Sequence, residues 1–207
     1  MRSAGDPSLL FPAEADCVGH AIPKRAADFA AGRLCARLAL AEFGVVDFPL
    51  LVAGDRQPMW PSSLVGSITH TSGLCAAVVA DRSTTAAIGI DCEVVQRVSA
   101  DISSEVCGAA ETIWIHSLPA EERAAGLALL FTAKEAFYKC QYPMTTEWLD
   151  FHDVRITPLN WGLPRSSFEV HSTRPIALDP RISHPLIGHY LFHGGFVTAG
   201  LSVPIFP

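Results

Sequence analysis

The stretch Thr85-Ala86-Ala87-Ile88-Gly89-Ile90-Asp91-Cys92-Glu93 decides how this chain is organised, because an apolar run ends there in two carboxylates. The run from Thr85 to Asp91 predicts a strand buried on both faces. Side chains at positions i and i+2 of a strand share a face, so Asp91 and Glu93 can bind one ion together. An isolated Asp-x-Glu pair is more often a solvated strand end, so this motif alone carries little weight.

A second motif follows in the stretch Phe131-Thr132-Ala133-Lys134-Glu135-Ala136-Phe137-Tyr138-Lys139. Its spacing predicts that Phe131, Glu135 and Tyr138 share one face of a helix. Taken alone, Glu135 and Lys139 would form an ordinary i,i+4 surface ion pair. A carboxylate on an aromatic face needs a partner, however, and a metal ion is a good one. Three carboxylates with lysines beside them suit a hard divalent cation that holds a phosphate chain.

Toward the N-terminus, the sequence predicts one helix and two strands. Pro23 suits the first turn of a helix, and Gly44 lies just past its expected end. Five apolar residues between them recur at helical spacing and predict a buried stripe, namely Phe29, Ala30, Leu34, Leu38 and Ala41. Two β-like runs, Val65–Thr69 and Leu74–Ala80, lie on either side of His70-Thr71-Ser72-Gly73.

Toward the C-terminus, Ser117–Tyr142 is predicted to be mainly helical, with interruptions near Pro119 and Gly126. The chain from about residue 153 onward has the character of strands and turns. The order helix, strands, helix, strands predicts an α+β fold made of two similar α/β halves. The polar segment from Asp81 to Thr85 is the predicted linker, which gives an N-terminal half of residues 1–85 and a C-terminal half of residues 86–207.

Composition restricts the possible classes of protein. With 207 residues, 49% apolar and 17% charged, the chain is long and apolar enough for a globular core. The formal charge of −6 argues against broad binding to nucleic-acid backbones. The six cysteines form no C-x-x-C motif, which favours free thiols in a reducing cytoplasm; they are Cys17, Cys35, Cys75, Cys92, Cys107 and Cys140. No signal peptide is expected, because Leu9-Leu10-Phe11 is cut short by Pro12.

The C-terminal stretch Ile182–Pro207 contains no Asp, Glu, Lys or Arg. Its histidines, glycines and prolines suit a membrane-spanning helix poorly, so no membrane contact is expected. Instead, Ile187–His193 and Phe196–Val203 are predicted to form a hairpin with its turn at Gly194-Gly195. Four histidines of this region could suggest zinc, but they lack a Cys partner and H-E-x-x-H spacing, so that reading is weak; they are His171, His184, His189 and His193.

Five motifs in sequence resemble the 4′-phosphopantetheinyl transferases in their long, pseudo-dimeric form. The motifs are Lys24-Arg25 with Gly32-Arg33, then Arg56…Pro58-Met59-Trp60-Pro61, then Gly66-Ser67-Ile68-Thr69-His70, and the two carboxylate motifs described above. The resemblance covers the chain from about Pro23 to Asp153. It is greatest to the bacterial type that activates the siderophore, polyketide and nonribosomal-peptide synthases of secondary metabolism.

This resemblance implies a pseudo-dimer with the active site in the cleft between its halves. The implied reaction transfers the 4′-phosphopantetheine arm of coenzyme A to a serine of an apo acyl, aryl or peptidyl carrier protein and releases 3′,5′-ADP. By the same resemblance, Asp91, Glu93 and Glu135 would hold Mg²⁺, or possibly Mn²⁺ in its place, against the coenzyme A pyrophosphate. Glu135 would also be the general base, and Lys134 and Lys139 would lie near the phosphates. The contacts to the phosphates of the adenosine part would come from Lys24, Arg25, Arg33, Arg56 and His70.

Two alternatives stay open at this point. A Mg²⁺-dependent nuclease also uses Asp, Glu and Lys, although the acidic chain has no long basic stripe for a strand. A non-catalytic module that binds coenzyme A or a carrier protein would not need all three carboxylates. The resemblance further implies a cytoplasmic monomer that binds no nucleic acid.

A carrier protein would need a docking surface beside the site. Trp114, Ile115 and Leu118 lie between the two carboxylate motifs, and we expect them to form part of an apolar surface for the carrier. The alternative is that they are ordinary core residues.

Overall fold

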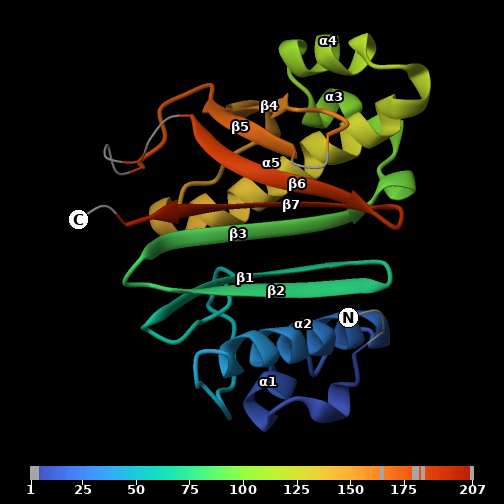
Figure 1. The fold of residues 1–207 in the computed structure, drawn as a ribbon. Coiled ribbons are helices and arrows are strands. Elements are labelled where there is room, and N and C mark those ends of the chain that lie inside the picture. Colours follow the sequence, from blue (N-terminus) through green and yellow to red (C-terminus); the bar gives the residue numbers. More distant parts are fainter. Residues whose placement is uncertain (1–4, 164–165, 179–181, 183–184, 206–207) are drawn as a thin grey trace.

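The chain folds into an α+β structure with two antiparallel sheets, and the computed structural model describes residues 5–163, 166–178, 182 and 185–205 (Figure 1). The helices are α1 (Pro12–Asp16), α2 (Pro23–Ala41), α3 (Ser103–Val106), α4 (Ala109–Ser117) and α5 (Arg123–Thr145). The strands are β1 (Leu64–Thr71), β2 (Leu74–Asp81), β3 (Thr85–Val94), β4 (Val154–Leu159), β5 (Ser166–Ser172), β6 (Leu186–His193) and β7 (Phe196–Pro204). Short 3-10 helices lie at Pro7–Leu9, Val95–Arg97, Ala100–Ile102, Ala120–Glu122 and Phe151–Asp153. The predicted α+β class is therefore confirmed.

The first part of the fold is a helix packed on a two-stranded hairpin. Pro23 occupies the first turn of α2, as predicted. β1 pairs with β2 from Leu64 opposite Asp81 to Thr71 opposite Leu74, so both predicted strands are confirmed. α2 contacts both strands of this hairpin (Figure 1).

The buried side of α2 differs from the predicted stripe. Leu38 was expected inside, yet it is 57% exposed, whereas Leu40 is buried. The cause is Glu14 of α1, a fully buried carboxylate that accepts hydrogen bonds from the Arg37 guanidinium at 2.7 Å and from the Leu50 N–H at 2.9 Å. α2 is therefore covered by the hairpin and also by the N-terminal segment, which apolar spacing alone does not reveal.

The second part of the fold is a five-stranded antiparallel sheet in the order β3-β7-β6-β5-β4, with α5 packed against β3 and β7. The predicted C-terminal hairpin is confirmed as β6 and β7. Its turn residues Gly194 and Gly195 have φ values of 59° and 82°, the left-handed region that glycine enters without strain.

The predicted helical region from 117 to 142 divides at Pro119, as expected, and α5 begins at Arg123. The second predicted interruption, at Gly126, is wrong, because α5 continues through this residue. The turn around Gly126 packs closely against Leu118 and the Trp114 ring. The preceding helix α4 was not predicted.

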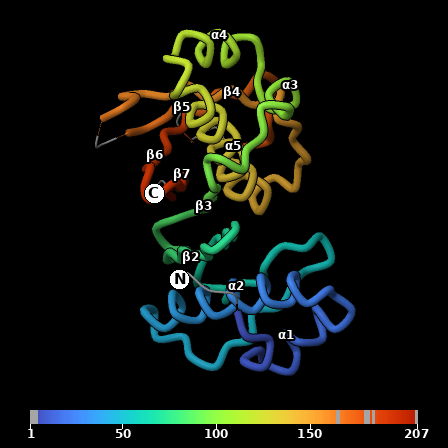
Figure 2. Tube along the Cα trace, turned by 90° about the vertical axis from the view of Figure 1, so that its right-hand side faces the viewer, coloured from blue at the N-terminus to red at the C-terminus, as the bar shows by residue number. Residues whose placement is uncertain are grey.

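The two parts of the fold meet where β1 lies beside β3, the edge strand of the larger sheet. Figure 2 shows α1 and α2 in one lobe and the green-to-red elements in the other, with β2 and β3 between them. The first sheet has two strands and the second has five. The predicted similarity of the halves, and the boundary between residues 85 and 86, remain predictions.

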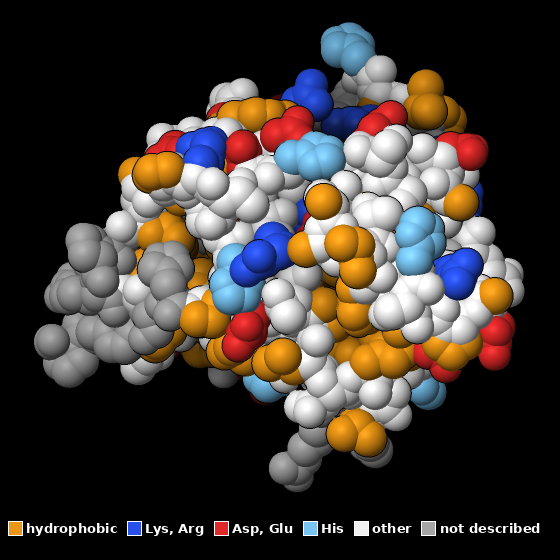
Figure 3. Space-filling view, turned by 90° about the horizontal axis from the view of Figure 1, so that it is seen from above, with side chains coloured by type: hydrophobic (Ala, Val, Ile, Leu, Met, Phe, Trp, Pro, Cys, Tyr) orange, Lys and Arg blue, Asp and Glu red, His pale blue; other side chains and the backbone are white. Residues whose placement is uncertain are grey.

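The surface seen from above mixes charges of both signs with hydrophobic side chains (Figure 3). On this face of the described chain, Lys and Arg side chains form separate small groups and no continuous basic stripe. None of the described helices combines the length and the apolar character needed to cross a membrane.

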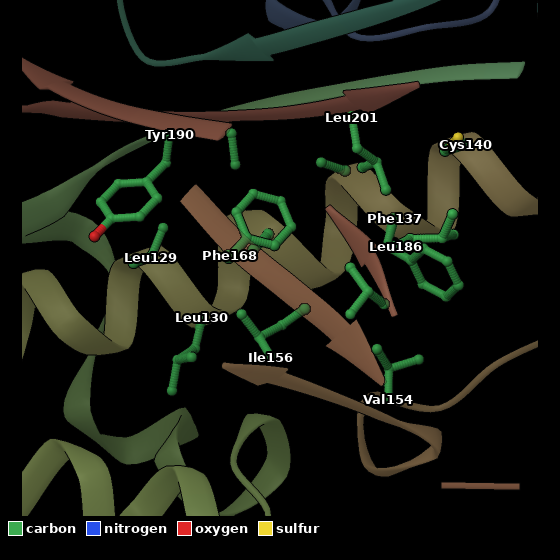
Figure 4. Packing of buried hydrophobic residues seen from close by; sticks show 14 of the residues in the cluster. Leu129, Leu130, Phe137, Cys140, Val154, Ile156, Phe168, Leu186, Tyr190 and Leu201 are labelled. Atoms are coloured by element: carbon green, nitrogen blue, oxygen red, sulfur yellow. The ribbon is translucent and has the colours of Figure 1, made fainter. Parts of the chain in front are cut away.

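The main hydrophobic core fills the space between α5 and the five-stranded sheet. Figure 4 shows Leu129 and Leu130 of α5 close to Phe168, Ile156 and Tyr190 of the strands. Each of these five side chains is buried. This packing fixes α5 in rotation and position, which decides which of its polar residues reach β3.

Candidate active site

The carboxylate motifs of β3 and α5 come together because the two backbones approach very closely at Gly89. A Cβ atom at this position would lie 2.0 Å from the carbonyl oxygen of Ala136, so only glycine fits there. The close approach brings Lys139 to Asp91, with 2.6 Å between Nζ and Oδ1. The spacing Gly-x-Asp in the strand therefore places a carboxylate directly beside the helix.

Asp91 is a buried carboxylate with one satisfied and one free oxygen. Its Oδ1 atom accepts hydrogen bonds from Lys139 and from the Thr69 hydroxyl, the latter at 2.8 Å. Its Oδ2 atom is buried and has no hydrogen-bond partner among the described residues. A buried acceptor without a partner is costly, so Oδ2 is where a bound cation would be stabilising.

Glu93 and Glu135 share the electrostatic environment of Asp91. The Thr71 hydroxyl donates a hydrogen bond of 2.8 Å to Glu93 Oε2. Burial raises the pKa of Glu135, the negative charges of Asp91 and Glu93 raise it further, and Lys139 opposes them. Three carboxylates are thus close enough to disfavour one another, and a cation would relieve this repulsion.

The donor set fits Mg²⁺ bound together with a phosphate. In the part of the chain that the structure describes, no three His, Cys, Asp or Glu side chains form a complete metal cage. Mg²⁺ does not require one, because it is usually held by one or two carboxylates, by substrate phosphates and by water. Asp91 with its free oxygen and one neighbouring carboxylate would provide the protein's share of such a site.

The same finding counts against the weak zinc reading of the C-terminal histidines, as far as they are described. His171 is paired with Glu169 at 3.0 Å, and His184 lies outside the described residues.

An apolar pocket of about 250 Å³ opens beside Glu135, between α5 and the segment that leads into β4. Tyr138 forms its aromatic wall, with the Tyr142 ring stacked at 5.3 Å and the Trp148 ring edge-on at 5.5 Å. The pocket is lined by Lys134, Glu135, Phe137, Tyr138, Trp148, Leu149, Asp150, Phe151 and Val154. The arrangement therefore suits a ligand with an anionic part and a long, less polar part.

The prediction for Lys134 is corrected by the structure. Its ammonium group is buried, and it donates hydrogen bonds to Glu111 Oε2 at 2.8 Å and to the carbonyl oxygens of Val106 at 2.7 Å and Phe151 at 2.8 Å. Lys134 has three N–H donors, and these contacts use all of them. Lys134 therefore holds the wall of the pocket together and is not free to contact a phosphate.

Glu111 completes this buried network from the other end. Its Oε2 atom also accepts the N–H of Gly108 at 2.8 Å, which caps the start of α4. Its Oε1 atom accepts the N–H of Ile156 in β4 at 2.8 Å. One ion pair thus connects α4, α5 and the sheet.

The structure does not bring Arg33 to the carboxylates. Arg33 is 4% exposed, and its guanidinium carbon lies 4.0 Å from the centroid of the Phe29 ring. Its Nε atom is buried without a hydrogen-bond partner among the described residues. The predicted phosphate contact of Arg33 remains a prediction.

The remaining predicted contacts lie on the outside of the first part of the fold. His70 is exposed near the tip of the hairpin, opposite Cys75, and the carbonyl of Cys75 accepts a hydrogen bond of 3.5 Å from Cys35 of α2. α2 therefore runs past the hairpin tip; Lys24 and Arg25 lie in its first turn.

Arg56 lies in an exposed loop with a positive φ of 71°. The negative charge of its neighbour Asp55 contributes to raising the pKa of Tyr138, so this loop approaches the pocket wall. Contacts of Lys24, Arg25, Arg56 and His70 with a ligand remain predictions.

The predicted docking surface is wrong in its residues. Ile115 and Leu118 are buried, and Trp114 packs against the Trp161 ring at 5.2 Å. These side chains belong to the core, because α4 turns them toward α5 and β4. The apolar residue that α4 exposes is Ile113, with 71% of its surface accessible.

Four residues around the site were not foreseen from the sequence: Thr69, Thr71, Glu111 and Trp148. The hydroxyl residues at alternate positions of β1 were a usable signal, because they share one face of the strand. Glu111 and Trp148 gave no such signal, since their roles depend on tertiary contacts.

The fold and the site define an α+β protein with an acidic cluster beside an apolar pocket, where its two parts meet. Comparison with known proteins places this chain more narrowly. The family described as 4′-phosphopantetheinyl transferase N-terminal domain matches residues 13–80, and the 4′-phosphopantetheinyl transferase superfamily matches residues 87–181. The chain belongs to the 4′-phosphopantetheinyl transferase family.

Similar curated proteins carry the same description. The 4′-phosphopantetheinyl transferase Svp of Streptomyces mobaraensis is 40% identical over 150 residues, which are 72% of this chain and 61% of that protein. PptT of Mycobacterium tuberculosis is 39% identical over 156 residues, or 71% of this chain and 64% of PptT. Enterobactin synthase component D of Salmonella typhi is 34% identical over 157 residues, covering 73% and 63%. The chain thus spans less than two thirds of the length of these relatives.

Proposed function

We propose that this chain transfers the 4′-phosphopantetheine arm of coenzyme A to a serine of an apo acyl, aryl or peptidyl carrier protein. The observation that carries this proposal is the free, buried Oδ2 atom of Asp91, placed beside Glu135 and Lys139 next to an apolar pocket. A pyrophosphate held at the carboxylates through a cation would put the pantetheine arm within reach of that pocket. Family membership supports the same reaction.

In this mechanism the serine oxygen attacks the β-phosphorus of coenzyme A. A new P–O bond forms to the carrier, and the P–O bond to 3′,5′-ADP breaks. Mg²⁺, or Mn²⁺ in its place, supplies neutralisation of the phosphate charge when it is bound by Asp91, Glu93 and Glu135. Phosphoryl transfer depends mainly on such positioning and charge stabilisation.

The chain's own residues then have separate tasks. Glu135, whose pKa is raised by burial and by its acidic neighbours, accepts the serine proton directly or through one water molecule. Lys139 holds Asp91 in orientation and places a positive charge beside the phosphates. Tyr138 and Trp148 bound the space for the pantetheine arm and exclude water from it.

The test is intact-mass spectrometry of several apo carrier proteins, from siderophore, polyketide and nonribosomal-peptide synthases, incubated with this chain, coenzyme A and Mg²⁺. We expect a mass gain of one phosphopantetheine arm, which EDTA prevents and excess Mg²⁺ restores. The Glu135→Gln variant serves as the matched control and should give no gain. No gain with any carrier would overturn the proposed transfer, and DNA cleavage in its place would support the nuclease alternative.

We also infer that the enzyme acts as a monomer in the cytoplasm, without nucleic acid. All six cysteines are free thiols, which suits a reducing compartment. Light scattering during size-exclusion chromatography tests the oligomeric state, and a stable dimer would contradict it.

A further inference from the structure

Three hydroxyl residues of β1 point at the edge of β3. Ser67, Thr69 and Thr71 occupy alternate positions of the strand, so their side chains share one face. All three form hydrogen bonds to β3, across the junction between the two parts of the fold. We refer to these three residues as the hydroxyl row.

The members of the hydroxyl row contact different groups. Ser67 Oγ accepts the backbone N–H of Ile90 at 3.2 Å. Thr69 Oγ1 accepts the N–H of Cys92 at 3.1 Å and donates to Asp91. Thr71 donates to the Glu93 carboxylate, and no contact of its hydroxyl with the β3 backbone is among the hydrogen bonds of the described residues. The row therefore changes along its length from supporting the strand to supporting its carboxylates.

The backbone contacts have a clear structural reason. β3 pairs with β7 on one side and is an edge strand on the other, so alternate N–H groups lack a ladder partner. Ser67 and Thr69 supply acceptors for two of these groups. No such need explains Thr71, which touches only a side chain whose oxygens water could otherwise solvate.

We propose that Thr71 is a positioning residue for the metal site, with Thr69 acting on Asp91 in the same way. Each hydroxyl engages one oxygen of a carboxylate and so fixes the rotation of that group. The first part of the fold thereby sets the ligand geometry of the second part. This inference rests on the proposed function, because it takes Asp91 and Glu93 as ligands of the cation.

Hydrogen bonds that orient metal ligands typically change metal affinity by about 10–100-fold. The Thr71→Val variant keeps the shape of the side chain and removes its hydroxyl, whereas Thr71→Ser keeps the hydroxyl. Ser67→Ala is the matched control, because it removes a member of the row that touches no carboxylate. Thr71→Ala provides a second hydroxyl-free variant if the valine does not fit.

The experiment measures Mn²⁺ binding to the full chain, with coenzyme A present, by electron paramagnetic resonance. We expect a dissociation constant roughly 10–100-fold higher for Thr71→Val and close to wild type for Thr71→Ser. The transfer rate of Thr71→Val should recover at high metal concentration, so the metal requirement changes more than kcat. Ser67→Ala should lower the thermal midpoint without changing metal affinity.

Unchanged Mn²⁺ affinity in folded Thr71→Val or Thr71→Ala would overturn the positioning role. An Asp91→Asn variant separates this failure from failure of the proposed function. If Asp91→Asn abolishes Mn²⁺ binding while Thr71→Val does not weaken it, only the positioning role is wrong. If Asp91→Asn leaves binding intact, the metal assignment itself is wrong.

Discussion

Lys134 and Lys139 lie five residues apart on α5, and each pairs with a carboxylate from another element, but the two pairs differ in kind. The Lys134–Glu111 pair has both side chains 2% exposed and its hydrogen-bonding groups satisfied. The Lys139–Asp91 pair is 29% and 7% exposed and leaves one carboxylate oxygen without a partner. Five residues turn a helix by roughly 140°, so one lysine faces the interior and the other faces β3. A satisfied pair builds the fold, and an unsatisfied pair is available for chemistry.

The largest effect is expected at the interior pair. Lys134→Met would leave the Glu111 carboxylate buried without its cation, together with two carbonyl oxygens that lose their donor. Breaking a buried ion pair in this way costs about 3–5 kcal/mol of unfolding free energy. Urea unfolding followed by circular dichroism measures this loss. A loss below about 1 kcal/mol, which is typical of surface pairs, would remove the distinction between the two lysines.

Lys139→Met should produce the opposite result. Removing a charge that stabilises a developing transition state lowers kcat by about 10²–10³-fold. The unfolding free energy should change by no more than about 1 kcal/mol, because this lysine is partly exposed. Transfer to a carrier protein, measured at saturating coenzyme A, gives the rate. Near-normal kcat in a folded variant would show that Lys139 has no part in the reaction.

A smaller effect is expected where α5 meets β3. Gly89→Ala would place a Cβ atom 2.0 Å from the Ala136 carbonyl oxygen and 2.8 Å from the Cys140 Cβ, so helix and strand must separate. Overpacking of this kind costs about 1–3 kcal/mol. The variant should also lose activity, because Asp91 moves relative to Lys139.

Gly200→Ala in the neighbouring strand β7 is the control for this change. A Cβ atom there would meet its nearest listed neighbour, the Gly89 carbonyl oxygen, at 3.4 Å, which is an ordinary contact. Equal thermal midpoints and rates for the two variants would contradict the argument that Gly89 sets the distance between helix and strand.

Much of the fold could be predicted because local signals agreed with tertiary structure. Pro23 began a helix, and the Gly194-Gly195 turn joined two alternating strands, as their backbone preferences require. The buried side of α2 could not be predicted, since the fully buried Glu14 binds it from a segment far from the hairpin. α4 escaped detection because it is a short helix of nine residues with mixed polarity.

The site was predictable where backbone spacing alone decided the geometry. Gly89 and Asp91 on a strand, with Glu135 and Lys139 on a helix, were expected together; Asp91 and Lys139 form an ion pair, and the charge of Asp91 reaches Glu135. Lys134 was misassigned because a sequence motif does not show what lies against each side of a helix. Its partner Glu111 comes from another helix, and its other acceptors are backbone carbonyls that no sequence pattern marks.

Glu135 provides the smallest test, because its effect on stability should be opposite to its effect on activity. Its pKa is raised in the folded, metal-free chain, so the folded state binds this proton more tightly than the unfolded state does. Stability contributed by the protonated form is therefore lost as the pH rises through the folded pKa. Glu135→Gln should abolish transfer, yet in EDTA at neutral pH it should have a higher thermal midpoint than wild type. The difference should vanish at acidic pH, where Glu135 is protonated; a lower midpoint for the variant at neutral pH would mean that the carboxylates do not repel one another.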